Sequence, residues 1–193
     1  MNSQMSASGR RNPLRQLLMT ALFAALTAIG AFLRIPAGVT SFTLQTFFCC
    51  MAGVLLGPYW GAASQLVYVL LGLVGLPVFA EGGGLTYLTR PSAGFLLGLV
   101  PMAFVTGLLS RRLSRSGGTL GRGRLALSCL GGVFALYLLG LPYLYFALAG
   151  AMPFGQCLVN GCLIFLPFDG VKLLCAVLLA SLLLPLLHRG RLI

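Results

Sequence analysis

The chain has very few charged residues, and only two of them are acidic. Of its 193 residues, only two are Asp or Glu, one is His and one is Lys. Charged residues make up 8% of the chain and hydrophobic residues 59%. A water-exposed surface of this size needs many more charges. The composition therefore excludes a soluble domain and predicts an all-α integral membrane protein.

The same scarcity excludes two kinds of chemistry. A P-loop needs a G-K-[ST] sequence, and Lys172, the only lysine, follows Val171 and precedes Leu173. The chain is therefore not expected to hydrolyse ATP, and any ATPase would be a partner subunit. Six cysteines without a C-x-x-C motif, and a single histidine, do not predict a metal site. A disulfide between Cys157 and Cys162 stays open.

Long apolar runs fill most of the sequence. A hydrocarbon core of about 30 Å requires about 20 apolar residues per helix. Six segments fit this requirement, at about 14–33, 42–57, 59–77, 92–109, 125–149 and 163–187. We expect one six-helix membrane domain over 1–193. Residues 1–12 are expected to form a disordered tail and 110–124 a flexible, basic cytoplasmic loop.

The arginines predict how the bundle is oriented. Ten of the thirteen basic residues precede the first segment, separate the fourth from the fifth or follow the sixth. The positive-inside rule places these regions, and both termini, in the cytoplasm of a multi-pass inner (plasma) membrane protein. Insertion and anionic lipid headgroups account for the net charge of +11, so no nucleic-acid partner is expected.

Asp169 and Lys172 are the most informative residues, because they interrupt the last apolar segment. Each ionised group costs about 2.5–3.5 kcal/mol at the centre of a membrane helix. Their i, i+3 spacing places both on one helix face. At 1.5 Å per residue, Lys172 lies roughly 22 Å from the cytoplasmic end of the segment, so a cavity beside the pair would open outward. The alternative is an ion pair that only joins two helices.

The outer loops supply further candidates. Glu81 is a candidate binding residue, and the three consecutive glycines that follow it, including Gly83 and Gly84, could expose backbone N–H groups to an anion. Arg90 could bind a carboxylate through its fork of donors. The alternative is a mobile loop with a solvated arginine. Three more polar or aromatic residues could line a pocket or could instead act as helix-cap or membrane-interface residues: Gln45, Tyr87 and Tyr145.

The first helix carries a row of small residues. Ala21 and Ala25, and Ala24 and Ala28, form overlapping small-x-x-x-small pairs. Such surfaces let helices approach closely in a membrane. They could dock a partner or pack inside the bundle.

Three motifs together resemble the BioY family, the biotin-specific S components of energy-coupling factor (ECF) transporters. They are GLPVFAEGGG, RPSAGFLLG and LPFDGVK, and the resemblance covers about 14–187. It implies a six-helix protein that captures biotin from outside, with Asp169 and Lys172 on the ureido ring. Arg90 and the amides of the glycine loop would bind the carboxylate of the biotin tail. Ser92 stands where threonine is more usual in this family.

The resemblance also implies partners. An alanine row on the first helix would dock the membrane coupling subunit (T component), which works with two ATPases, although solitary or homo-oligomeric operation stays open. Two other functions stay open. One is an S component for another vitamin such as thiamine. The other is an intramembrane enzyme using Asp169 and Lys172, although no His or Cys cluster supports it. We expect no catalytic residue and no cofactor.

Overall fold

The structure is a computed structural model that describes residues 13–37, 40–115, 121–148 and 153–189. The predicted tail over 1–12 lies outside the described residues. The elements are α1 (Pro13–Phe32), β1 (Arg34–Ala37), β2 (Thr40–Thr43), α2 (Gln45–Leu56), α3 (Pro58–Leu73), the 3-10 helix η1 (Leu85–Thr89), α4 (Ala93–Arg115), α5 (Arg122–Ala147), α6 (Phe154–Leu158), the π-helix η2 (Val159–Leu163) and α7 (Leu166–Arg189).

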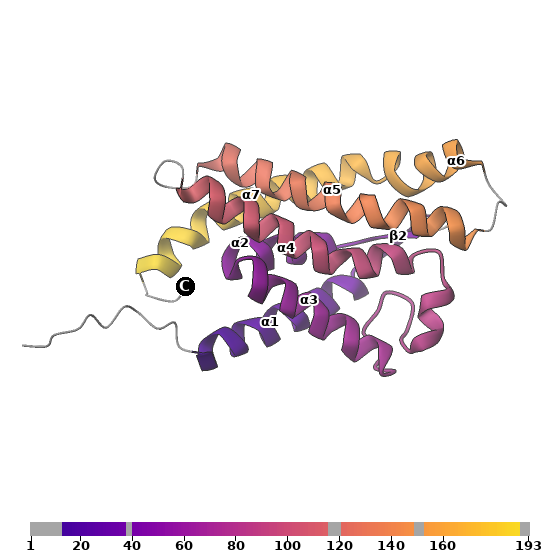
Figure 1. Cartoon of the computed structure of the whole chain (residues 1–193), viewed down its shortest axis with the longest axis horizontal. Coiled ribbons are helices and arrows are strands. Elements are labelled where there is room, and N and C mark those ends of the chain that lie inside the picture. The colour runs from indigo at the N-terminus through magenta and orange to yellow at the C-terminus, as the bar shows by residue number, and fades with distance from the viewer. Residues whose placement is uncertain (1–12, 38–39, 116–120, 149–152, 190–193) are drawn as a thin grey trace, which may run out of the picture.

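The long helices lie side by side along the long axis of the molecule (Figure 1). The beginning of α1 and the end of α7 lie at the same end of the bundle, together with the end of α4 and the beginning of α5. The segment between α3 and α4 lies at the opposite end with α6. All the arginines of the long helices therefore gather at one end, as the sequence predicted.

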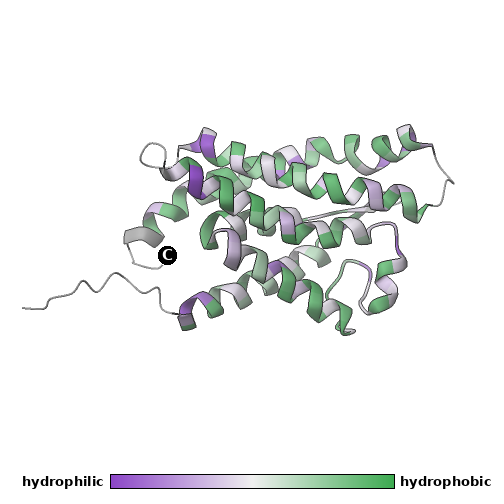
Figure 2. Ribbon diagram, in the orientation of Figure 1, coloured by the Kyte–Doolittle hydropathy of each residue, from purple (hydrophilic) through white to green (hydrophobic). Residues whose placement is uncertain are grey.

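Within the part of the chain that the structure describes, four helices are long and apolar enough to cross a membrane: Pro13–Phe32, Ala93–Ser114, Arg122–Ala147 and Phe154–Leu186. Their outer faces carry large apolar side chains, such as Leu14, Phe134 and Leu182, each at least 61% exposed. Figure 2 shows hydrophobic residues along nearly the whole length of these helices. Apolar side chains on the outside are stable only against lipid tails, so the chain is a membrane protein.

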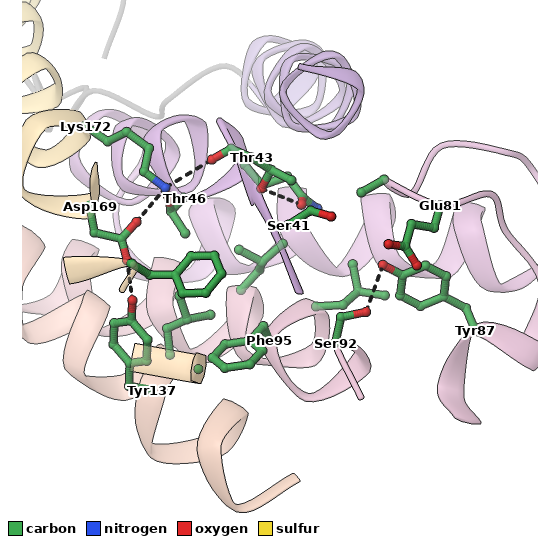
Figure 3. A pocket seen from close by; sticks show the side chains of 17 residues that line it. Ser41, Thr43, Thr46, Glu81, Tyr87, Ser92, Phe95, Tyr137, Asp169 and Lys172 are labelled. Carbon is green, nitrogen blue, oxygen red and sulfur yellow. Dashed lines mark hydrogen bonds and ion pairs between the residues drawn. The ribbon is translucent and has the colours of Figure 1, made fainter. Parts of the chain in front are cut away.

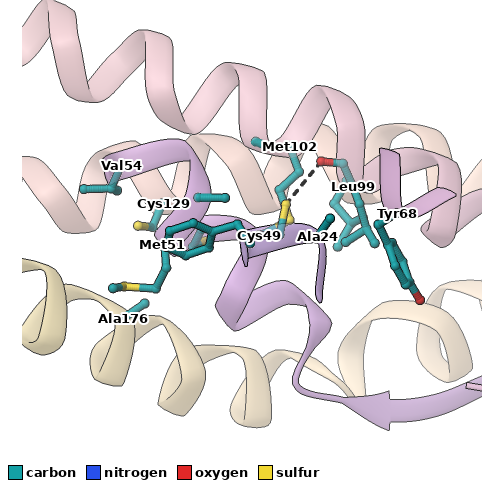
Figure 4. Close-up of a cluster of buried hydrophobic side chains, with 14 of the residues drawn as sticks. Ala24, Cys49, Met51, Val54, Tyr68, Leu99, Met102, Cys129 and Ala176 are labelled. Atoms are coloured by element: carbon teal, nitrogen blue, oxygen red, sulfur yellow. Dashed lines mark hydrogen bonds between the residues drawn. The ribbon is translucent and has the colours of Figure 1, made fainter. Parts of the chain in front are cut away.

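Helix α2 is short and occupies the centre of the bundle. Every residue from Cys49 to Leu56 is buried, within the hydrophobic cluster of Figure 4. Its backbone approaches α4 closely, because a Cβ on Gly53 would lie only 2.7 Å from the carbonyl oxygen of Ala103. A Cβ on Gly107 would meet the backbone of Gly57 at 2.5 Å. Glycine is therefore required where α2 and α4 cross.

The expectation of an all-α fold is wrong at one place, the connection between α1 and α2. Strands β1 and β2 form an antiparallel hairpin in which Ile35 lies opposite Phe42. The Phe42 ring stacks against Phe165 at 4.4 Å and Phe168 at 4.3 Å, next to the start of α7. The apolar segment predicted from residue 42 was thus partly strand, held in place by contacts distant in sequence.

Other boundaries also differ from the prediction. Helix α3 ends at Leu73 rather than near 77, because Gly75 has a φ of +116° and cannot continue a helix. Helices α4 and α5 extend into the predicted loop over 110–124, and residues 116–120 lie outside the described residues. The arginines there bond helix-end carbonyls: Arg111 donates to Leu56 at 3.0 Å and Arg124 to Leu113 at 3.2 Å.

Candidate functional site

A pocket with an empty volume of about 720 Å³, including open space at its mouth, lies between the β1–β2 hairpin, helix α7 and the loop that precedes α4 (Figure 3). Five of the residues predicted to bind substrate line it: Gln45, Glu81, Tyr87, Asp169 and Lys172. Its other lining residues are Ser41, Thr43, Thr46, Ala80, Ser92, Phe95, Leu96, Leu99, Leu136, Tyr137, Gly161 and Phe165.

Asp169 and Lys172 form an ion pair on the pocket wall rather than facing lipid. The Lys172 Nζ lies 2.5 Å from the Asp169 Oδ1, and the two side chains are 13% and 9% exposed. Lys172 also donates to the backbone carbonyl of Thr43 at 3.1 Å. On the other side, the Tyr137 hydroxyl donates to the Asp169 Oδ2 at 2.5 Å. Each ion is therefore held from two directions in a nearly dry environment.

These contacts leave capacity for a guest. A lysine ammonium has three donors, and the two bonds above use two of them. A carboxylate has about four lone-pair positions, and its two protein partners here leave the others. A small molecule with adjacent N–H donors and a carbonyl acceptor is complementary to this arrangement.

The mouth of the pocket carries an ion-pair cluster. The Arg90 Nη1 donates to the Glu81 Oε2, and the Arg34 Nη1 lies 3.7 Å from the Glu81 Oε1. Arg90 also lies over the Tyr87 ring, 5.8 Å from its centroid. Arg90 is thus near the mouth but not among the lining residues, and its binding role stays a prediction. With two cations around one anion, the cluster is net positive.

Tyr87 adds a polar group at this end of the pocket. Its side chain is buried between Phe79 and the start of α4, and Ser92 Oγ approaches its hydroxyl at 3.4 Å. Burial raises the pKa of the Tyr87 hydroxyl. The hydroxyl therefore stays protonated at neutral pH and can donate to an anionic or carbonyl group.

The glycine loop, residues 82–84, supports the pocket wall, but none of its three glycines is among the residues that line the pocket. Gly82 and Gly84 have φ of +113° and +94°, which other residues adopt only with strain. The Gly84 N–H donates to the Gly72 carbonyl at 2.7 Å, and a Cβ on Gly83 would lie 2.1 Å from the Leu76 carbonyl oxygen. The loop thus packs on α3, and the Gly84 amide is already bonded within the protein.

Two other predicted sets lie outside the pocket. Tyr145 packs edge-to-face against Phe146 and Phe154, with ring centroids 5.8 and 5.7 Å away, and is not among the lining residues. On α1, Ala21 and Ala25 are exposed, Ala28 is half-buried and Ala24 is buried. The alanine row is therefore split between the outer face and the core. Cys157 and Cys162 carry free thiols, so the disulfide left open by the sequence is not formed.

Comparison with known proteins decides the family. The model of the BioY family matches residues 1–189. The chain belongs to the BioY family. The biotin transporter BioY of Thermotoga maritima is 36% identical over 168 residues, which are 86% of this chain and 94% of that protein. A relative from Lysinibacillus sphaericus is 45% identical over 132 residues, 68% of this chain and 65% of its own length.

A solved structure gives the same result for the fold. The S-component for biotin of an ECF-type ABC transporter superposes with a TM-score of 0.80 at 28% identity. The match covers 90% of this chain and 94% of the other. The BioY resemblance read from the three motifs is thereby confirmed.

Three groups of this BioY-family site were not predicted from the sequence. Tyr137 and the Thr43 carbonyl hold the ion pair from positions 32 and 129 residues away. Arg34 is the second partner of Glu81. Only Arg34 carried a usable signal, since Arg34 and Arg90 are the two basic residues of the loops predicted to lie outside, and Glu81 is the one acid of those loops.

Proposed function

We propose that this chain captures biotin at the outer face of the membrane as the substrate-binding S component of an ECF-type transporter. The observation that carries the proposal is the ion pair of Asp169 and Lys172 on the wall of an open pocket. The chain's membership of the BioY family and its structural likeness to a biotin S component support the same function.

The ureido ring of biotin suits the pair. A ureido group presents two N–H donors and one carbonyl acceptor. The Asp169 carboxylate would accept from an N–H group, and the Lys172 ammonium would donate to the carbonyl. Tyr137 and the Thr43 carbonyl would hold both ions in position and still leave each ion with hydrogen-bonding positions for the ligand. Leu96, Leu99 and Phe165 would contact the apolar part of the ligand.

The valerate tail would point toward the mouth. A carboxylate there would meet the net positive cluster of Arg34, Glu81 and Arg90, and the donor hydroxyl of Tyr87. Arg90 would bind it through its guanidinium fork. A contribution from the Gly83 N–H remains part of the proposal.

Calorimetry of the detergent-purified protein tests the function. Biotin is expected to bind tightly. An analogue with the ureido carbonyl replaced by an imine is expected to bind at least about tenfold more weakly, because the resulting cyclic guanidine is protonated at neutral pH and presents a donor, not an acceptor, to Lys172. A biotin amide, which has no tail carboxylate, tests the mouth separately. No heat with biotin, or tighter binding of thiamine, would overturn the assignment.

The remaining architecture follows the S-component plan. We propose a single domain of six spans, formed by α1, α2, α3, α4, α5 and α7, with both termini in the cytoplasm of the inner membrane. The arginine-rich helix ends at one end of the bundle support this orientation. A coupling T component and two ATPases would supply the energy for uptake, and solitary or homo-oligomeric operation is the alternative.

The exposed alanines of α1 are our candidates for docking the coupling subunit. Replacing Ala25 with Trp is expected to reduce coupled biotin uptake by roughly tenfold or more, because the bulky ring prevents close helix approach. Biotin affinity should stay within about twofold, since Ala25 is exposed and is not among the residues that line the pocket. Uptake into cells and calorimetry of the same variant measure the two effects.

The matched control is Leu138→Trp, which places the same ring on the exposed face of α5. It is expected to leave uptake unchanged. Loss of biotin binding by Ala25→Trp would instead mean that the alanine packs within the bundle. Normal uptake would mean that the partner docks elsewhere.

A further inference from the structure

Tyr68 of α3 has an unusual position for a buried tyrosine. It is 1% exposed and is not among the residues that line the pocket. Figure 4 shows it at the edge of the buried cluster, with its hydroxyl pointing away from the apolar side chains. That hydroxyl accepts a hydrogen bond from Gln45 Nε2 at 2.8 Å and donates to the Val78 carbonyl at 3.2 Å. It therefore connects two segments that flank the substrate site.

The directions of these bonds determine how Gln45 is oriented. A phenol has one proton, and the Val78 carbonyl can only accept it. The Tyr68 oxygen can then offer Gln45 only a lone pair, so the glutamine must turn its NH₂ group toward Tyr68. Its Oε1 consequently faces Thr43, whose hydroxyl donates to it at 2.8 Å. The amide of this pocket residue thus has one favoured orientation.

From Thr43 the connection continues to the ion pair. The Thr43 backbone carbonyl accepts the hydrogen bond from Lys172. A continuous series of contacts therefore runs from α7 through β2 and α2 to Tyr68 on α3. The position of Thr43, and with it one contact of the Lys172 ammonium, depends on how Gln45 is held.

Tyr68 also fixes the opposite wall. Val78 directly precedes the segment that brings Ala80 and Glu81 into the pocket. Phe79, 1% exposed, packs edge-on against Tyr68, with ring centroids 5.6 Å apart, and at a tilt against Tyr87, with centroids 4.7 Å apart. One side chain thus supports both the hairpin side and the glycine-loop side of the site.

We propose that Tyr68 is a positioning residue for substrate binding. Its hydroxyl sets the orientation of the Gln45 amide and the position of Val78–Glu81, so that the two walls are already in place when the ligand enters. The inference rests on the proposed function, because biotin is the probe. A merely structural tyrosine would change stability without changing how tightly the pocket holds its ligand.

Tyr68→Phe in the full chain tests the proposal, since it removes the hydroxyl and keeps the ring. We expect biotin affinity to fall by about tenfold, mostly through faster dissociation. In a Gln45→Leu background the same change should reduce affinity by less than it does in the wild type, because only the contact with Val78 is then left to lose. The control is Tyr59→Phe, on the exposed face of α3, which should leave binding unchanged.

The outcomes separate the two proposals. Equal affinity and dissociation rate in wild type and Tyr68→Phe, or full additivity with Gln45→Leu, would overturn the positioning role alone. Absence of biotin binding by the wild type would overturn both proposals. If Tyr68→Phe does not fold, Gln45→Leu should still speed amide hydrogen exchange in Val78–Glu81, because Tyr68 carries the effect to that loop. Unchanged exchange there would overturn the positioning role.

Discussion

Replacing Lys172 with alanine is expected to weaken biotin binding by about 2–5 kcal/mol, or between roughly 30-fold and several thousand-fold. The variant loses the proposed donor to the ureido carbonyl. It also leaves the Asp169 carboxylate in a nearly dry site with Tyr137 as its remaining partner. Asp169→Asn should have an effect of similar size, because it leaves the Lys172 ammonium without its anionic partner. Calorimetry in detergent measures both variants.

Two further variants sharpen this test. Val171→Ala, on the exposed face of α7 beside the pair, is expected to bind biotin normally. The double variant Asp169→Asn/Lys172→Ala should lose less affinity than the sum of the two single changes, since neither charge is then left without its partner. Near-normal affinity in both single variants would remove the pair from the binding site.

Adding a methyl group at Gly53 is expected to destabilise the bundle by about 1–3 kcal/mol, because its Cβ would lie 2.7 Å from the Ala103 carbonyl oxygen. Neither backbone can move aside without disturbing the buried centre of α2. For a chain of this size, the unfolding temperature in detergent should fall by about 2–4 °C per kcal/mol. Thermal unfolding of Gly53→Ala measures the effect.

The matched control is Gly155→Ala in α6, where a Cβ would meet nothing within 4 Å. It should leave the unfolding temperature unchanged. An unaltered unfolding temperature in Gly53→Ala would mean that α2 and α4 are less closely packed than the structure has them.

Much of the helical architecture was predictable because lipid imposes a simple rule on length and polarity. Each predicted apolar segment overlaps a helix, and the arginines mark the helix ends at one side. The hairpin was not predictable in the same way. Its strand β2 is stabilised by the stacking of Phe42 on Phe165 and Phe168, and no local pattern reveals a contact across more than 120 residues.

Some residues of the candidate site could likewise be predicted from the sequence, and others could not. Asp169 and Lys172 were evident because two ions in an apolar helix are costly, and their spacing is local. Tyr137 was not, because a tyrosine in a membrane helix is ordinary until its hydroxyl is seen 2.5 Å from a carboxylate. The glycine loop was recognised, but glycine freedom alone does not tell whether the backbone faces a ligand or, as at Gly84, a neighbouring helix.

The brevity of α2 has a consequence for how the guest arrives. Its 12 residues span about 18 Å, well short of the hydrocarbon thickness. In the proposed orientation, the hairpin that precedes it would continue outward at a depth where unpaired backbone is tolerated only beside protein or water. The open pocket beside the hairpin would then admit water into the outer leaflet. A polar vitamin entering there would exchange its hydration shell only on meeting the two buried ions.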